Sequence, residues 1–323
     1  MIQSQPRWRR FRRALAGTGI AVLALGLAAC ASSSEPPEGV DGAGVVADPG
    51  AIPLPTEVIP EQELNDEIHA LVPQAFLDAG AVRVATSADY PPNEFVSSTG
   101  DVVGIHADMG KALGEIIGVD FEFTVTSFDG IIPGLQADRY DIGMSSAAVT
   151  NERKEIVDFV SDILGANALM VRADFEADSA DLDLICGLTV GVGKGTIEAE
   201  RATTQSEKCV EEGKDAATIQ TYPSQVEAVL ALTSSRVDAI WAAGLALSYI
   251  EKGNPGVIKV IGRDLFVPGT NGIMLTKDNG LAEPVQRALQ QMIDDGTYTA
   301  ILDKWGAGAY GVDKAEINPD TPY

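Results

Sequence analysis

Hydroxyl side chains and one arginine gather in the stretch MSSAAVTNERK, residues 144–154, directly after an apolar segment. Thr150 can cap a helix that begins at Asn151, which would put Arg153 in the first helical turn. A positive side chain is unfavourable at that end of a helix, because the helix dipole favours negative charge there. A bound anion would explain Arg153, since a guanidinium can hold a carboxylate through two parallel hydrogen bonds. A solvated surface arginine is the alternative.

A second anion site is indicated by GVGKGT, residues 191–196. The stretch is not a phosphate-binding loop, because its glycine spacing differs and Lys194 is followed by Gly195 in place of Ser or Thr. It still predicts a turn between a strand and a helix, with Thr196 as the cap. The free backbone N–H groups of such a turn favour an anion, carboxylates included. A plain helix cap without a ligand is the alternative.

Chemistry based on histidine or on a metal has few candidates. The chain has two histidines, His69 and His106, and no cluster of His, Cys and carboxylate residues at ligand spacing. We expect both histidines to be surface or capping residues. We also expect no metal, no cofactor and no catalytic residue.

Composition indicates an acidic globular protein. The 323 residues are 45% hydrophobic and 22% charged, which suits one large or two medium domains. The net charge is −24, and five of the arginines lie in the first 13 residues, so the rest of the chain is more acidic still. This balance excludes a nucleic-acid partner.

The N-terminus has the anatomy of a secretory signal peptide, a basic segment followed by an apolar run over 14–29. The end of that run, Leu27-Ala28-Ala29-Cys30, resembles the bacterial lipobox, in which the cysteine is diacylated and becomes the new N-terminus. We therefore predict a signal peptide over 1–29, lipidation of Cys30 and a flexible tether over 30–62. The protein would then be exported, by the general or the twin-arginine route, and anchored to the outer side of the cell membrane.

Two further cysteines, Cys186 and Cys209, could form a disulfide, because export permits one. Such a bridge would contribute roughly 3 kcal/mol in the chain-entropy treatment. Two separate buried thiols are the alternative.

Apolar runs and helical patterns alternate along the body of the chain. VRVATS, VDFEFTVTS and LTVGVGKG have the features of strands, and ADMGKALGEIIG has apolar residues at helical spacing. This alternation predicts an α/β fold with mainly parallel sheets, in two units of about 100 residues each.

From about residue 79 to residue 306 the chain resembles the polar amino-acid binding family of ABC-importer solute-binding proteins. The matching stretches occur in family order: VRVATSADYPPNEF, VVGIHADMGKAL, SFDGIIPGLQADRYDIGMSS, TNERKEIVDF, LTVGVGKGT, SSRVDAI and DDGTYTAILDKWG. The resemblance implies a clamp of the periplasmic-binding-protein type, with two α/β lobes joined by two hinge strands and closing around a ligand. The implied limits are 63–169 and 271–323 for lobe 1 and 170–270 for lobe 2. Disulfide-forming cysteines at these places are similar to those of an actinobacterial-type branch.

The resemblance also implies a set of ligand contacts. Arg153 would pair with the ligand's α-carboxylate, and the backbone N–H of Thr196 would meet the same group from the second lobe. Tyr90 and Phe128 would be aromatic walls on either side of the ligand's side chain. The other implied contacts come from Ser145, Ser146 and Ser87.

Two positions depart from the family pattern. Ala148 stands where the family usually has a hydroxyl that helps to hold the ligand's ammonium, and Ala243 stands where it usually has the aspartate that is the counter-ion. A buried ammonium without a counter-ion is costly. Either another acid, such as Asp89, Glu94 or Asp264, replaces it, or the ligand lacks a free α-ammonium. Nearby Trp241 could line the vacated space, although a core position is favoured.

We therefore expect a monomeric, lipid-anchored binding protein that delivers an amino acid or a related small carboxylate to an ABC permease. It would bind by lobe closure and catalyse nothing. Two alternatives stay open, a cyclohexadienyl-dehydratase-like enzyme on the same scaffold and a ligand sensor with an altered pocket. The missing acid at position 243 disfavours the enzyme.

Overall fold

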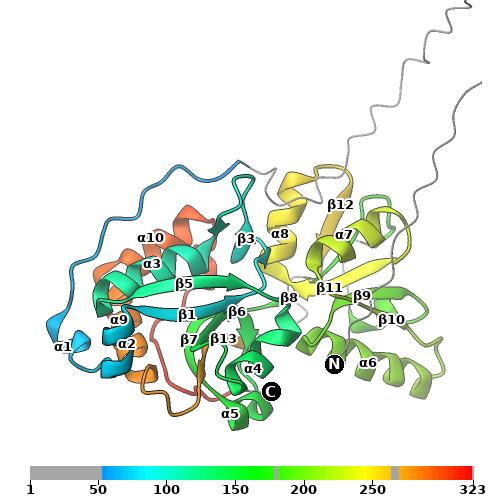
Figure 1. The fold of residues 1–323 in the computed structure, drawn as a ribbon. Helices are drawn as coiled ribbons and strands as arrows, with labels where there is room; N and C mark the ends of the chain where they lie inside the picture. Colours follow the sequence, from blue (N-terminus) through cyan, green and yellow to red (C-terminus); the bar gives the residue numbers. More distant parts are fainter. Residues whose placement is uncertain (1–52, 178–180, 263–268, 322–323) are drawn as a thin grey trace, which may run out of the picture. The chain divides into compact units, whose positions relative to one another are not determined.

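The computed structural model describes residues 53–177, 181–262 and 269–321 (Figure 1). In these ranges no helix is long and apolar enough to cross a membrane. The predicted signal peptide, the predicted lipidation site Cys30 and Asp264 lie outside the described residues.

The described chain forms two five-stranded sheets, and we call the parts built on them lobe 1 and lobe 2. In lobe 1 the strand order is β5-β1-β6-β13-β7. The first three strands are parallel, and β13 runs antiparallel to both of its neighbours. The strands of this sheet are β1 (Ala81–Thr86), β5 (Asp120–Val125), β6 (Ile142–Ala148), β7 (Val157–Gly165) and β13 (Gly269–Thr276).

Helices cover both faces of the lobe 1 sheet, because its strands have apolar side chains on both faces. In β1, Val82 and Val84 join the core beneath α3, α9 and α10, whereas Ala85 joins the core beneath α4. A small sheet, β2-β3-β4, completes the lobe. The remaining elements of lobe 1 are α1 (Asp66–His69), α2 (Gln74–Ala79), β2 (Asp89–Tyr90), β3 (Glu94–Val96), β4 (Val102–Val103), α3 (Ile105–Ile117), α4 (Phe128–Gln136), α5 (Asn151–Ile156), α9 (Ala282–Asp295), α10 (Thr297–Lys304) and η3 (Gly308–Tyr310).

Lobe 2 repeats the design with the strand order β10-β9-β11-β8-β12. Strands β10, β9 and β11 are parallel, and β8 is antiparallel to both of its neighbours. Trp241 is buried in the core between the sheet and α6, so it is the core tryptophan that the sequence favoured. The elements of lobe 2 are β8 (Asn167–Arg172), η2 (Leu182–Ile185), β9 (Thr189–Gly193), α6 (Ile197–Glu211), β10 (Thr218–Tyr222), α7 (Gln225–Thr233), β11 (Ala239–Ala243), α8 (Gly244–Gly253) and β12 (Ile258–Ile261).

A disulfide joins Cys186, just after η2, to Cys209 in the last turn of α6, with 5.6 Å between the two Cα atoms. The alternative of two separate thiols is therefore wrong. Both cysteines belong to lobe 2, and the bridge ties the C-terminal part of α6 to the segment that precedes β9.

The chain changes sheets between Gly165, the last residue of β7, and Asn167, the first residue of β8. This is a few residues before the limit expected at 169, because apolar periodicity does not indicate where a strand changes its pairing partner. β13 belongs to the lobe 1 sheet from Gly269 onward. A Cβ atom at Gly165 would lie 2.7 Å from Oδ1 of Asn271, so the side chain of Asn271 occupies the space that the glycine leaves. The lobe limits themselves stay a prediction.

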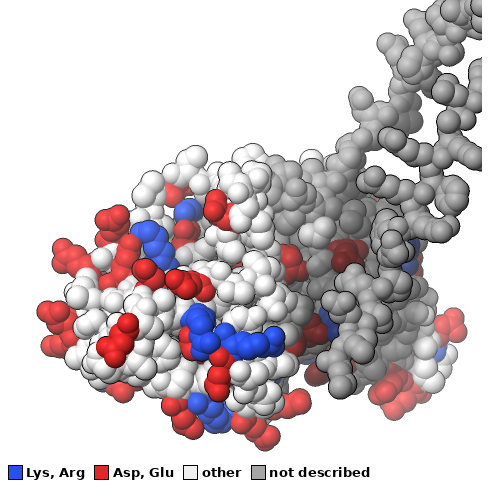
Figure 2. Space-filling view, viewed as in Figure 1, with Lys and Arg blue, Asp and Glu red and all other residues white. Residues whose placement is uncertain are grey.

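Acidic side chains are spread over the face shown in Figure 2, and lysines and arginines occupy fewer places on it, in keeping with the net charge of −24.

Candidate functional site

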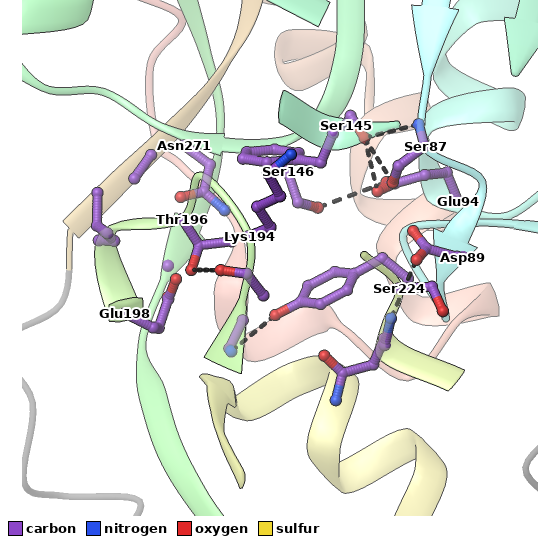
Figure 3. Close-up of a pocket in the computed structure, with 18 of the residues that line it drawn as sticks. Ser87, Asp89, Glu94, Ser145, Ser146, Lys194, Thr196, Glu198, Ser224 and Asn271 are labelled. Atoms are coloured by element: carbon purple, nitrogen blue, oxygen red, sulfur yellow. Dashed lines mark hydrogen bonds between the residues drawn. The ribbon is translucent and has the colours of Figure 1, made fainter. Parts of the chain in front are cut away.

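A pocket with about 760 Å³ of atom-free space, part of it open to solvent, is lined by residues at the carboxyl ends of strands in both lobes (Figure 3). Such strand ends are where ligands bind in open α/β sheets. The residues that line the pocket are Ser87, Asp89, Tyr90, Glu94, Phe128, Ser145, Ser146, Ala148, Arg153, Gly165, Asn167, Gly193, Lys194, Thr196, Ile197, Glu198, Tyr222, Pro223, Ser224, Gln225, Ala243, Gly269 and Asn271.

Arg153 is held in place by backbone carbonyls of both lobes. Its Nη1 donates to the carbonyl of Ala148 at 2.9 Å, and its Nη2 donates to the carbonyl of Gly195 at 3.0 Å. The guanidinium also lies over the ring of Phe128, 5.7 Å from the centroid. The predicted cap is confirmed, because the hydroxyl of Thr150 accepts the backbone N–H of Arg153 at 3.1 Å.

Within the described part of the chain, the positive charge of Arg153 has no close counter-ion. Among the residues that the structure describes, no carboxylate oxygen lies within 4.0 Å of its nitrogens. Burial lowers the pKa of Arg153, and Glu198 is the acid that opposes this most. An arginine remains protonated in proteins, so this end of the pocket presents a fixed positive charge to an anion.

The first turn of α6 faces the same end of the pocket. Thr196 caps the helix as predicted, because its hydroxyl accepts the N–H of Ala199 at 3.3 Å and donates to the carbonyl of Gly193 at 2.8 Å. Gly195 has φ +75°, which favours glycine, and a Cβ there would also lie 3.0 Å from Cβ of Asp129. The two helix starts that the sequence indicated therefore meet at one place, as the Arg153 bond to Gly195 shows.

The aromatic wall from lobe 1 is also bonded to lobe 2. The hydroxyl oxygen of Tyr90 accepts the backbone N–H of Ala243 at 2.8 Å. Burial, with a smaller effect of the Glu198 charge, raises the pKa of Tyr90 well above its usual value. The hydroxyl is thus neutral and keeps its own proton for a further acceptor.

The opposite end of the pocket is acidic (Figure 3). Oε1 of Glu94 lies 3.2 Å from the hydroxyl of Ser145, which in turn lies 2.9 Å from the hydroxyl of Ser87. The hydroxyl of Ser146 is 3.5 Å from Oε2 of Glu94. Asp89 accepts the backbone N–H of Gln225, at the start of α7, at 3.0 Å. Burial raises the pKa of both acids, that of Glu94 to about 7.

His106 corrects the expectation of a surface or capping histidine. Its side chain is 0% exposed, with Nδ1 2.6 Å from Glu94 and Nε2 3.0 Å from Asp162. Burial disfavours the charged ring, but the hydrogen bonds to Asp162 and Glu94 outweigh burial and raise the pKa of His106. The sequence hid this role because the partners of His106 lie 12 and 56 positions away. His69 does cap a helix, with Nδ1 2.8 Å from the carbonyl of Ile117 at the end of α3.

Each of the two departures from the family pattern lies beside an asparagine. Ala243 pairs with Asn167 across β11 and β8, and Ala148 pairs with Asn271 across β6 and β13. Both asparagines line the pocket. Asn167 is only 7% exposed, and its Nδ2 has no hydrogen-bond partner in the described ranges. Unsatisfied buried donors of this kind are uncommon in native proteins and call for an acceptor.

The structure brings together every pocket residue that the sequence predicted. The seven predicted contacts and the two alanines all line the pocket: Arg153, Thr196, Tyr90, Phe128, Ser145, Ser146, Ser87, Ala148 and Ala243. Of the three acids considered as substitutes, Asp89 and Glu94 line it as well. Their roles toward a ligand stay predictions.

Among the residues of the pocket that sequence reasoning missed are Glu198, Asn167 and Asn271. Glu198 had a local signal, because it follows the Thr196 cap by two positions and so must lie in the first turn of α6. The asparagines had none, since their place depends on which strands pair across the two sheets.

Comparisons with known proteins agree with this geometry. The family model of the bacterial extracellular solute-binding proteins, family 3, matches residues 82–308. An arginine-binding protein of Corynebacterium glutamicum, ArgT, is 31% identical over 311 residues, which cover 95% of this chain and 96% of that protein. An ancestral arginine-binding protein solved with bound arginine is 32% identical, with a TM-score of 0.63 over 70% of this chain and 98% of that one. An ancestral amino-acid-binding protein described as a precursor of cyclohexadienyl dehydratase is 31% identical, with a TM-score of 0.65 over 73% and 99%.

Proposed function

The chain belongs to the bacterial extracellular solute-binding proteins of family 3, and from that membership we propose that it captures a cationic α-amino acid for an ABC permease. Its role as an amino-acid solute-binding protein of an ABC transporter follows from the family. The proposal adds the class of ligand. One observation carries it: the pocket has at one end an arginine without an ion-pair partner among the described residues, and at the other two acids whose pKa values burial raises.

The carboxylate of the ligand lies at the Arg153 end. The guanidinium from lobe 1 and the first turn of α6 from lobe 2, with the positive end of the helix dipole, converge there. A carboxylate bonded to both would join the lobes and favour the bound conformation over any more open one. Tyr90 and Phe128 supply flat apolar walls for the part of the ligand that lies between the two ends.

The cationic end of the ligand's side chain lies near Asp89 and Glu94. The ring of His106 lies between Glu94 and Asp162, so one positive ring faces two acidic side chains. Asp89 is a further acid on the pocket wall. Besides Arg153, the described lining of the pocket includes one more cationic side chain, Lys194, whose Nζ forms an ion pair with Asp129 at 2.7 Å. Burial disfavours the ionised form of both Asp89 and Glu94, so a ligand cation beside them would stabilise that form. The arginine-binding relatives agree with this ligand class.

Calorimetric titration of the wild-type protein with L-arginine, L-lysine, L-glutamine and L-leucine tests the proposal. We expect the two cationic amino acids to bind much more tightly than the two neutral ones. Arg153→Ala should abolish the binding. The matched control is Arg287→Ala, which removes an exposed arginine on α9 that pairs with Glu283. Retained binding by the Arg153 variant would show that the carboxylate lies elsewhere.

Lipid anchoring at Cys30 and a monomeric state belong to the same proposal. The diacylated cysteine would hold the protein at the membrane beside its permease, and residues 30–62 would let the lobes reach it. Replacing Cys30 by Ala in the full-length chain should release the protein from the membrane fraction without changing its affinity for ligand. Size-exclusion chromatography with light scattering should give the mass of one chain.

An enzyme on this scaffold is the second candidate, and one observation favours it. Glu94 is a buried carboxyl group on the pocket wall with a pKa raised to about 7, as a general acid requires. The similarity to a precursor of cyclohexadienyl dehydratase points in the same direction. Incubation with prephenate or arogenate decides between the two: product formation that Glu94→Gln removes would establish the enzyme. A protein that binds amino acids but needs no permease for its cellular effect would instead be a sensor.

A further inference from the structure

We propose that Glu198 is the counter-ion of the ligand's α-ammonium, taking from the first turn of α6 the role that no acid on β11 can fill. The inference rests on the proposed function, because it requires that the ligand's carboxylate lies at Arg153. It implies that the ligand is an amino acid with a free ammonium, despite Ala148 and Ala243.

The position of Glu198 in the pocket is the first reason. The carboxylate and ammonium of an α-amino acid share one carbon atom, so the ammonium must lie beside the carboxylate. Glu198 follows Thr196 by two residues and lines the pocket with it. Figure 3 shows Glu198 beside Thr196, whereas Glu94 and Asp89 lie at the other end.

The surroundings of the two alanines are the second reason. Ala148 and Ala243 carry only methyl groups, and the backbone N–H of Ala243 is already bonded to the hydroxyl oxygen of Tyr90. Tyr90 thereby lies over the end of β11. The side chains that pair with the alanines, Asn271 and Asn167, are neutral amides. They can complete the hydrogen bonds of an ammonium or a carboxylate but cannot supply its counter-charge.

The charges around Arg153 are the third reason. Glu198 is half-buried, and its charge acts on Arg153 more than that of any other acid. Among the described residues Arg153 nevertheless has no carboxylate within 4.0 Å, so the two do not form an ion pair. Burial raises the pKa of Glu198, and hydrogen bonds to its own backbone N–H and to Thr196, followed by the charge of Arg153, oppose the rise. A zwitterionic head group between them gives each charge a partner: the carboxylate faces Arg153 and the ammonium faces Glu198. A des-amino ligand satisfies only the arginine.

The test compares L-arginine with 5-guanidinopentanoate, which is the same molecule without the ammonium. Calorimetric titrations use the wild type, Glu198→Gln and the control Glu200→Gln, which removes an exposed acid from the same turn of α6. We expect Glu198→Gln to weaken L-arginine binding at least about tenfold and to leave the des-amino ligand within about twofold. The control should change neither affinity.

Equal effects of Glu198→Gln on both ligands, or none, would overturn the inference. Failure of the proposed function gives a different result: either the wild type does not bind L-arginine, or the Arg153→Ala variant retains binding. Thermal unfolding verifies that the variants fold. Glu198→Asp, which keeps the charge on a shorter side chain, provides a second check: the inference requires that it discriminate between the two ligands better than Glu198→Gln does.

Discussion

The disulfide between Cys186 and Cys209 gives a prediction about stability that is separable from ligand binding. The two cysteines are 23 positions apart, and a closed loop of that length restricts the unfolded chain by about 3 kcal/mol in the chain-entropy treatment. Cys209 is fully buried in the core of lobe 2, so alanine is the suitable replacement, because serine would bury a hydroxyl group. We therefore predict that Cys186→Ala/Cys209→Ala lowers the free energy of unfolding by about 3 kcal/mol.

Ligand affinity should be nearly unchanged in the same variant. Cys209 lies in the last turn of the 15-residue helix α6, whereas Thr196 and Glu198 lie at its start. At a rise of 1.5 Å per residue, about 20 Å separates the bridge from the pocket end of the helix. The bonds of Thr196 to Gly193 and Ala199 position that end locally. We expect the dissociation constant for L-arginine to change by less than about twofold.

Denaturant unfolding and calorimetric titration on the same preparations measure both quantities. In thermal unfolding, a loss of this size corresponds to a decrease in Tm of roughly 6 to 12 °C. Wild-type protein reduced with dithiothreitol is the control and should match the double variant. A loss below about 1 kcal/mol would refute the loop-entropy argument, since it would mean that the unfolded chain is little restricted by the bridge. A large loss of affinity would refute the separation of α6 into two independent ends.

Three further predictions concern the pocket. Burial raises the pKa of Glu94 to about 7, and a cation binds its ionised form. The affinity for L-arginine should therefore rise by up to about tenfold per pH unit as the pH increases toward 7, and level off above it. Calorimetric titrations across that range measure this, and a pH dependence that survives in Glu94→Gln would contradict it. Gly165→Ala places a Cβ 2.7 Å from Oδ1 of Asn271 and should displace that amide. We expect the affinity for L-arginine to fall several-fold and the free energy of unfolding to decrease by about 1 kcal/mol. An unchanged affinity would show that Asn271 does not contribute to binding. Tyr90→Phe keeps the aromatic wall but loses the 2.8 Å bond from the N–H of Ala243, so calorimetry should show binding weakened about tenfold, and an unaltered affinity would mean that this bond is not needed for capture.

Much of the fold was predictable because its signals are local. The caps at Thr150 and Thr196 were recognised from single residue types before helical patterns, and both hydroxyls accept the expected backbone N–H groups. The alternation of strands and helices predicted two α/β units, and two such sheets are present. The prediction of a surface or capping position for His106 was wrong for the opposite reason. Its burial depends on Asp162, which belongs to a strand 56 positions further along the chain.

The sequence by itself determined which residue types stand at the ends of strands and the starts of helices, because backbone geometry and capping depend on a few neighbouring residues. Only the tertiary structure decided how the charges of the pocket are distributed. It put Glu198 beside Thr196, where its charge acts on Arg153, and Glu94 and Asp89 at the other end. These positions follow from the pairing of strands and from contacts between lobes, such as the bond from Arg153 to Gly195, 42 positions away. A local pattern cannot encode such contacts, because they form only when distant segments pack together.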